Sequence, residues 1–297
     1  MARDPRDRGT RRSRQAGESR GTRNRVSDYE RLVAEALRAP VVGWNFDWLR
    51  GRATEERPTW EYSRRARSAL AAASTAMDID TGGGEVLAYI DRFPPLMVAT
   101  EAWKPNVGVA KERLRPLGVH VVETDGTPRL PFRSETFDLV LNRHGLRGRA
   151  DSAEAEVWWK EVARVLRPGG ALLTQQVGGR GMQSLGEAMG VVPRASRLQF
   201  DATKARRVIE RSGFVVTDAR EEFLRTVFFD VGAVVYYLRL VIWIVPGFST
   251  VSHEVQLRRL HDRIQVEGPF VSHSHRILVE AHRNPSHRSS AASREAV

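Results

Sequence analysis

The chain has 297 residues, of which 41% are hydrophobic, so it is long and apolar enough to bury a full core. It contains no cysteine, which excludes disulfides, thiolate metal sites and a cysteine nucleophile and fits a cytoplasmic protein. The formal net charge is +11, but residues 1–26 carry +6, which leaves only +5 for the rest of the chain. The overall charge is therefore weak evidence for nucleic-acid binding.

The N-terminal residues 1–26 are rich in arginine and lack apolar side chains to bury, so we expect a disordered basic tail. They contain no apolar run typical of a secretory signal. Residues 27–74 are predicted to form a helical extension. A capping-box pattern at Ser27 and Glu30 predicts a helix that ends near Ala39, and "RPTWEYSRRARSALAAAS" predicts a second helix.

Between residues 75 and 283, segments typical of strands alternate with segments typical of helices. This pattern predicts an α/β fold, a doubly wound and mostly parallel seven-stranded sheet with helices on both faces. The strands are expected at residues 76–80, 96–100, 119–123, 137–142, 170–177, 214–218 and 271–281. A helical insert is expected at residues 231–267, before the last strand, and a disordered tail at 284–297.

Residues 227–247 approach the length of a membrane span. Asp230 and Arg239 interrupt the segment, and each would cost about 2.5–3.5 kcal/mol near the centre of a span. Its apolar residues follow helical spacing. We therefore predict a helix that packs on the protein core, and no membrane partner.

Ligands of open α/β sheets bind beyond the carboxyl ends of the strands, so the residues that end each strand are the candidate site. Glycines follow the first strand in "MDIDTGGGE" and allow a close backbone approach to a ligand. Acidic residues end the second and third strands, and three polar residues end the fourth. These positions are Gly82, Gly83, Gly84, Glu101, Asp125, Asn142, Arg143 and His144.

Two common phosphate-binding motifs are absent from the glycine loop. Leu87 stands where G-x-G-x-x-G needs its third glycine, and no lysine follows the glycines as a P-loop requires. Both the dinucleotide and the P-loop interpretations are therefore weakened.

The chain resembles the class I S-adenosylmethionine-dependent methyltransferases. Family members carry D-x-G-x-G-x-G after the first strand, acidic residues after the next two, "LPF" and "FD" near the fourth, and "RVLRPGG" before the fifth. This sequence has "DIDTGGG", "TE", "TDGTPRLPFRSETFDLVLNRHG" and "EVARVLRPGG" in that order. The resemblance is clear over about residues 75–180 and weaker as far as 283.

The resemblance implies a binding role for each matching position. Asp78 and the three glycines would shape the loop around the methionine part of the cofactor. Glu101 would accept hydrogen bonds from both ribose hydroxyls and Asp125 would bind the adenine amino group, while Asn142 is assigned to the same site. Asp80 departs from the family pattern, which has glycine there. Its carboxylate would repel the cofactor's carboxylate or attract its ammonium, and aspartate tolerates a positive φ.

Methyl transfer from a sulfonium is an in-line displacement that needs neither a metal nor a covalent intermediate. His144 is a candidate general base, although it could instead bond its own loop. Arg143 could hold an acidic substrate group or be solvated. His273 and His275 share a strand face, but without a third ligand no metal site is predicted. Gln175 or Gln176 could face the substrate.

Three functions are consistent with these residues. The first is methylation of a small molecule, with a substrate pocket formed by the insert and by aromatic residues of the extension. The second is methylation of RNA with the arginine-rich tail as an electrostatic arm. The third is cofactor binding without catalysis, if Asp80 has spoiled the site. The aromatic residues of the extension are Trp44, Phe46, Trp48, Trp60 and Tyr62.

Overall fold

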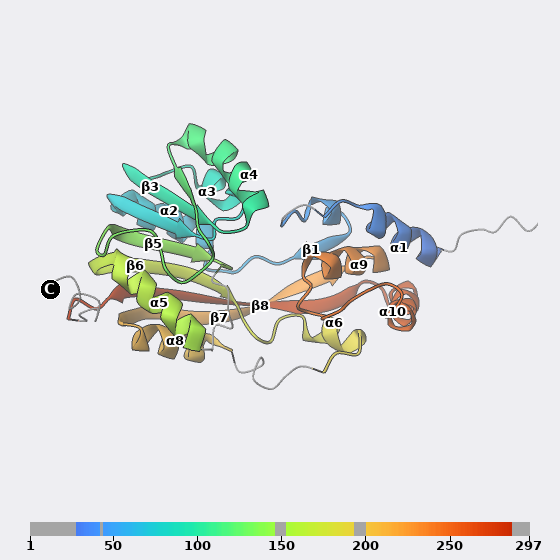
Figure 1. Cartoon of the computed structure of the whole chain (residues 1–297). Coiled ribbons are helices and arrows are strands. Elements are labelled where there is room, and N and C mark those ends of the chain that lie inside the picture. The colour runs from blue at the N-terminus through green and yellow to red at the C-terminus, as the bar shows by residue number, and fades with distance from the viewer. Residues whose placement is uncertain (1–27, 42–43, 146–152, 193–199, 287–297) are drawn as a thin grey trace, which may run out of the picture.

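The computed structural model describes residues 28–41, 44–145, 153–192 and 200–286. The predicted tail at 1–26 and most of 284–297 lie outside these residues. One mixed sheet forms the centre of the molecule (Figure 1). Its strands are β1 (Ala53–Glu55), β2 (Thr75–Ile79), β3 (Leu96–Glu101), β4 (His120–Glu123), β5 (Phe137–Arg143), β6 (Leu166–Val177), β7 (Phe214–Phe228) and β8 (Phe270–Arg283).

The spatial order of the strands is β1-β7-β8-β6-β5-β2-β3-β4. Strands β2 to β6 are mutually parallel, and β8 runs antiparallel to both of its neighbours, β6 and β7. The predicted mostly parallel, doubly wound sheet is therefore confirmed. It has eight strands rather than seven, because the short β1 of the N-terminal extension pairs antiparallel with the end of β7.

Helices cover both faces of the parallel part of the sheet. Leu70, Ile90 and Leu114 of three helices pack with strand residues on one face, and Trp158 and Trp159 pack on the other. Burial of each such side chain contributes about 1.5–3 kcal/mol relative to exposure. The first face carries α2 (Tyr62–Ala72), α3 (Glu85–Ile90) and α4 (Lys104–Leu114), and the second carries α5 (Ala153–Val165) and α8 (Ala202–Arg211).

A separate apolar cluster surrounds the far halves of β7 and β8, which extend well past the parallel strands (Figure 1). The helices here are α1 (Asp28–Arg38), α6 (Gln183–Ala188), α9 (Val231–Leu240) and α10 (Glu254–Glu267), together with the short 3-10 turn η1 (Asp47–Leu49). A second 3-10 turn, η2 (Arg115–Leu117), follows α4. Thus α9 and α10 lie where the insert was expected.

The segment that resembled a membrane span divides between two elements. Its first residues end β7, and α9 begins after Asp230, whose carboxylate accepts a 2.8 Å hydrogen bond from the amide of Ala233. Nearly all of α9 is buried, including Val234 and Val235. Within the described ranges, no helix is both long and apolar enough to cross a membrane.

Candidate functional site

The glycine loop joins β2 to α3 and requires a left-handed backbone at several positions. Asp80, Gly82 and Gly84 have φ angles of 55°, 65° and 79°. Aspartate adopts the positive φ that the sequence analysis expected it to tolerate. A Cβ atom at Gly84 would lie 2.7 Å from Cγ of Leu114, so α4 also restricts this position sterically. The conformation and the close packing together demand glycine at 84.

Arg113 of α4 holds the loop through hydrogen bonds. Its Nη1 atom donates to the carbonyl of Gly83 and, at 2.6 Å, to the carboxylate of Glu85. A Cβ atom at Gly83 would lie 2.9 Å from the same Nη1 atom. The loop is therefore fixed in shape by α4, which favours a preformed binding site.

Glu101 connects this loop to the end of β3. Its Oε2 atom accepts a 2.7 Å hydrogen bond from the amide of Gly82, and Oε1 accepts one of 2.7 Å from the amide of Trp103. The side chain is only 5% exposed, and desolvation raises its pKa. Each carboxylate oxygen has a second lone pair for a ligand hydroxyl. Glu101 thus supports the loop as well as being the expected ribose ligand.

Asp78 lies at the base of the same loop. Burial raises its pKa to about 7, the hydrogen bond with the Thr81 side chain and the charge of Arg143 oppose the rise, and the charges of Asp80 and Glu101 add to it. Neither Asp78 nor Glu101 forms an ion pair with any residue of the described segments. Carboxylates so close together are stabilised in the ionised form by a cation. The loop therefore favours a ligand with positive charge.

The predicted adenine ligand, Asp125, follows β4 and is exposed. Its Oδ1 atom accepts hydrogen bonds from the hydroxyl and the amide of Thr127 at 2.7 and 2.9 Å, and these bonds lower its pKa. Glu101 ends the neighbouring strand β3, so both acids lie at one edge of the sheet. Their assigned cofactor roles stay predictions.

Asn142 is completely buried at the end of β5. Its amide nitrogen donates to the carbonyl of Ile79, at 3.1 Å. Its oxygen accepts from Gln176 at 2.6 Å and from the hydroxyl of Thr174 at 3.2 Å. These bonds connect the ends of β2, β5 and β6. Any contribution of Asn142 to cofactor binding would therefore be indirect, because it positions these strand ends.

His144 follows β5 and belongs to a hydrogen-bonded chain that sequence reasoning missed. The indole Nε1 of Trp60 donates to Oε1 of Gln175 at 2.7 Å, and Nε2 of Gln175 lies 2.9 Å from Nε2 of His144. Although the His144 side chain is exposed, desolvation by surrounding protein lowers its pKa well below the ordinary histidine value, and the charges of Arg143 and Arg276 add to the effect. The imidazole is therefore neutral.

Arg143 has an exposed side chain beside this chain of bonds. Its electrostatic neighbours include Tyr62, Arg276 and Glu55. Arg276 of β8 pairs with Glu55 of β1 at 2.8 Å, whereas Arg143 forms no ion pair within the described segments. The extension therefore brings Glu55, Trp60 and Tyr62 to the end of β5. The sequence analysis predicted a role in the site for Trp60 and Tyr62 but not for Glu55.

Tyr62 is buried, and its hydroxyl lies close to the backbone of Asn142 and to Asp78. Desolvation raises its pKa well above the ordinary tyrosine value. Its position beside the site is consistent with a ligand-binding cleft.

Other candidate residues lie elsewhere. Trp44 packs on Trp243, at 5.5 Å between ring centroids, so it belongs to the interface between the extension and the turn after α9 rather than to the site. His275 is buried, stacks on Phe223 and lies 3.1 Å from Glu221. No group of three metal-binding side chains occurs in the described residues.

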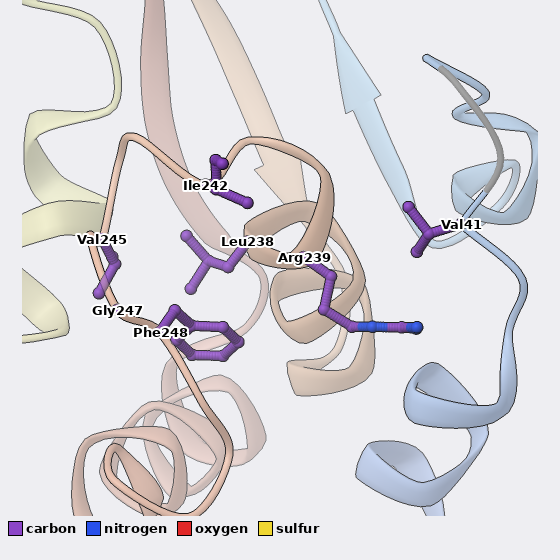
Figure 2. Close-up of a pocket in the computed structure, with 7 residues that line it drawn as sticks. All are labelled: Val41, Leu238, Arg239, Ile242, Val245, Gly247 and Phe248. Carbon is purple, nitrogen blue, oxygen red and sulfur yellow. The ribbon is translucent and has the colours of Figure 1, made fainter. Parts of the chain in front are cut away.

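A cavity of about 390 Å³ lies at the end of α9 and is separate from the strand ends described above (Figure 2). Arg239 borders it, but its guanidinium donates to the carbonyls of Ala36 and Ala39 at the end of α1. The cavity is lined by Val41, Leu238, Arg239, Ile242, Val245, Gly247 and Phe248. The strand ends, with their converging polar groups, remain the candidate site.

Comparison with known proteins agrees with this choice. Residues 77–174, which contain most of the strand-end residues, match a family model described as a methyltransferase domain. No curated protein matches the chain in sequence.

Two solved structures share the fold. One is BH2331 of Bacillus halodurans C-125, described as a candidate methyltransferase, with a TM-score of 0.53 and 18% identity over 76% of this chain and 99% of that chain. The other is YcgJ of Bacillus subtilis, with a TM-score of 0.51 and 15% identity over 76% and 99% of the two chains.

Proposed function

We propose that the chain transfers a methyl group from S-adenosylmethionine to a small molecule. The match of residues 77–174 to a methyltransferase domain model and the shared fold support this proposal. The observation that supports this best is the pair of buried acids, Asp78 and Glu101, beside a glycine loop and without ion-pair partners in the described residues. S-adenosylmethionine carries an ammonium and a sulfonium, the charges that such acids stabilise.

The residues of the loop fit this cofactor in several ways. Glycines at 82 and 84 leave the backbone accessible, and the buried Thr81 hydroxyl contacts the carboxylate of Asp78. Asp80 adds a carboxylate to the loop, at a φ of 55°. The proposed cofactor-binding residues are Asp78, Asp80, Gly82, Gly83, Gly84, Glu101, Asp125 and Asn142.

The bound cofactor would supply an electrophilic methyl group. The chain's own contribution is then to align the acceptor with that group and to exclude water. Arg143 and His144, at the end of β5, are proposed to contact the acceptor, and the extension is proposed to enclose it through Trp60 and Tyr62.

Incubation of the protein and a cell extract with S-adenosylmethionine labelled in its methyl group tests this function. The proposal predicts label in the small-molecule fraction. Label confined to RNA would favour the RNA alternative instead. Binding of the cofactor without transfer to any fraction would favour the noncatalytic alternative.

A further inference from the structure

The hydrogen-bonded chain from Trp60 determines which nitrogen of His144 carries a proton. An indole Nε1–H can only donate, so the Gln175 atom that it contacts at 2.7 Å is the carbonyl oxygen. The Gln175 amide nitrogen therefore faces His144 and donates to its Nε2 atom at 2.9 Å. A neutral imidazole has one proton, so that proton is on Nδ1.

His144 consequently presents a donor rather than a base. Its Nε2 lone pair is engaged by Gln175, and its Nδ1–H makes no hydrogen bond to the described residues. The lowered pKa of His144 agrees with a neutral ring. A group that approaches Nδ1 must therefore accept a hydrogen bond.

Arg143 supplies a positive charge at the same strand end. Its neighbour Arg276 is neutralised by Glu55 at 2.8 Å, but Arg143 has no such partner in the described segments. Desolvation by surrounding protein and the charge of Arg276 lower the pKa of Arg143, so an anion bound here would stabilise the charged guanidinium. One unpaired guanidinium matches a ligand with a single negative charge.

The neighbouring acidic groups are poorly placed to remove a proton from an acceptor. Glu55 is paired with Arg276, and Tyr62 stays protonated at neutral pH because desolvation raises its pKa. Asp78 lies in the loop proposed for the cofactor. Glu55, Tyr62 and Asp78 therefore do not supply a base for an acceptor at this site.

We infer that the methyl acceptor is a small-molecule carboxylate, bound by the guanidinium of Arg143 and the Nδ1–H of His144, with Gln175 positioning the imidazole. The inference rests on the proposed function and names its substrate class. A carboxylate is already ionised at neutral pH, so it needs no base. The planar fork of arginine also matches the two oxygens of a carboxylate.

The reaction balances without proton transfer. A carboxylate oxygen forms a bond to the methyl carbon as the carbon–sulfur bond breaks, and the electron pair of that bond stays on sulfur. The products are a neutral methyl ester and the neutral thioether S-adenosylhomocysteine. An anion and a sulfonium thus neutralise each other, which is favourable in a site that excludes water.

The label-transfer experiment tests the substrate class when the labelled small-molecule fraction is treated with mild alkali. A methyl ester releases its label as volatile methanol, whereas methyl ethers and methylamines keep theirs. Release of the label is the expected result. Alkali-stable label would overturn the inference while leaving the proposed function intact. No label in small molecules and no S-adenosylhomocysteine binding would overturn both.

Substitution of Arg143 tests its role in binding the acceptor carboxylate. Arg143→Gln should lower kcat/KM for the labelled acceptor about 10- to 150-fold, the usual range for loss of a charged hydrogen bond. Arg143→Lys should recover part of the loss, since it keeps the charge without the fork. The exposed Arg259→Gln is the matched control and should have no effect. Unchanged kcat/KM in Arg143→Gln would contradict the assignment.

Substitution of Gln175 tests the tautomer. In Gln175→Glu the carboxylate still accepts from Trp60 but cannot donate to His144, so the imidazole proton should move to Nε2. Nitrogen-15 NMR of the histidine ring should show Nδ1–H in the wild type and Nε2–H in the variant, with S-adenosylhomocysteine affinity unchanged. Protonated Nε2 in the wild type would overturn the inference.

Discussion

The amide of Gly82 donates a 2.7 Å hydrogen bond to Oε2 of Glu101, and this bond joins the glycine loop after β2 to the end of β3. One carboxylate therefore holds the loop and remains available to a ligand through its second lone pairs. The shape of the loop and the affinity for a ligand should change together when this side chain is altered.

Glu101→Gln should weaken S-adenosylhomocysteine binding about 10- to 150-fold, because an amide nitrogen replaces one acceptor of a charged hydrogen bond. Thermal stability should also fall, since both Glu101 oxygens accept backbone amides. Calorimetry measures the affinity. Glu123→Gln, at the register neighbour of Glu101 on β4, is the matched control and should bind as the wild type does.

A cofactor analogue without ribose hydroxyls separates the two roles of Glu101. The wild type should bind this analogue about 10- to 150-fold more weakly than S-adenosylhomocysteine, the same loss that Glu101→Gln causes. Glu101→Gln should bind the analogue nearly as well as it binds S-adenosylhomocysteine. If the variant binds S-adenosylhomocysteine as tightly as the wild type, Glu101 does not hold the ribose.

Gly84→Ala should destabilise the protein more than Gly118→Ala. Both glycines have a positive φ, but a Cβ atom at Gly84 meets Leu114 at 2.7 Å whereas one at Gly118 meets nothing within 4 Å. The left-handed conformation costs each variant about 1–2 kcal/mol, and overpacking adds about 1–3 kcal/mol at Gly84 alone. Urea unfolding measures the difference, and equal losses would contradict the packing argument.

Asp78 should make the protein less stable as the pH rises toward 7. Its folded pKa is about 7 against 3.8 for the free side chain, so over this interval the folded state binds more protons than the unfolded state. The free energy of unfolding then falls by at most about 1.4 kcal/mol per pH unit from this group. Urea unfolding of Asp78→Asn should show a flatter dependence between pH 4 and 7. Identical slopes would argue against a raised pKa.

Binding of S-adenosylmethionine at pH 7 should release protons, because its positive charges favour ionised Asp78. Calorimetry in two buffers with different ionisation enthalpies measures the release. The effect should be smaller with S-adenosylhomocysteine, which lacks the sulfonium charge, and should be absent in Asp78→Asn. Equal proton release by Asp78→Asn would assign it to another group.

The sequence was informative where local chemistry determines structure. The glycines after β2 and Glu101 at the end of β3 could be identified because strand ends and turns follow from neighbouring residues. The full length of β7 could not, since a register shift between Val216 and Asp218 breaks the alternation of buried and exposed residues. With only three residues, β1 was too short to show any periodicity.

The contacts on the acceptor side of the site could not be predicted from sequence patterns either. Trp60 and Gln175 are 115 residues apart in the chain, and Arg276 and Glu55 are 221 apart. No periodicity connects such pairs, because only the folding of the extension against the sheet brings them together. Gln175 could be identified as a strand-end residue, but its hydrogen-bond partners could not.

Calorimetric titration of the purified protein with S-adenosylhomocysteine, and separately with NADH, tests the central claim most directly. The proposed function predicts saturable binding of S-adenosylhomocysteine at one site per chain, weakened in Glu101→Gln, and no comparable binding of NADH. Tight binding of NADH without binding of S-adenosylhomocysteine would contradict it.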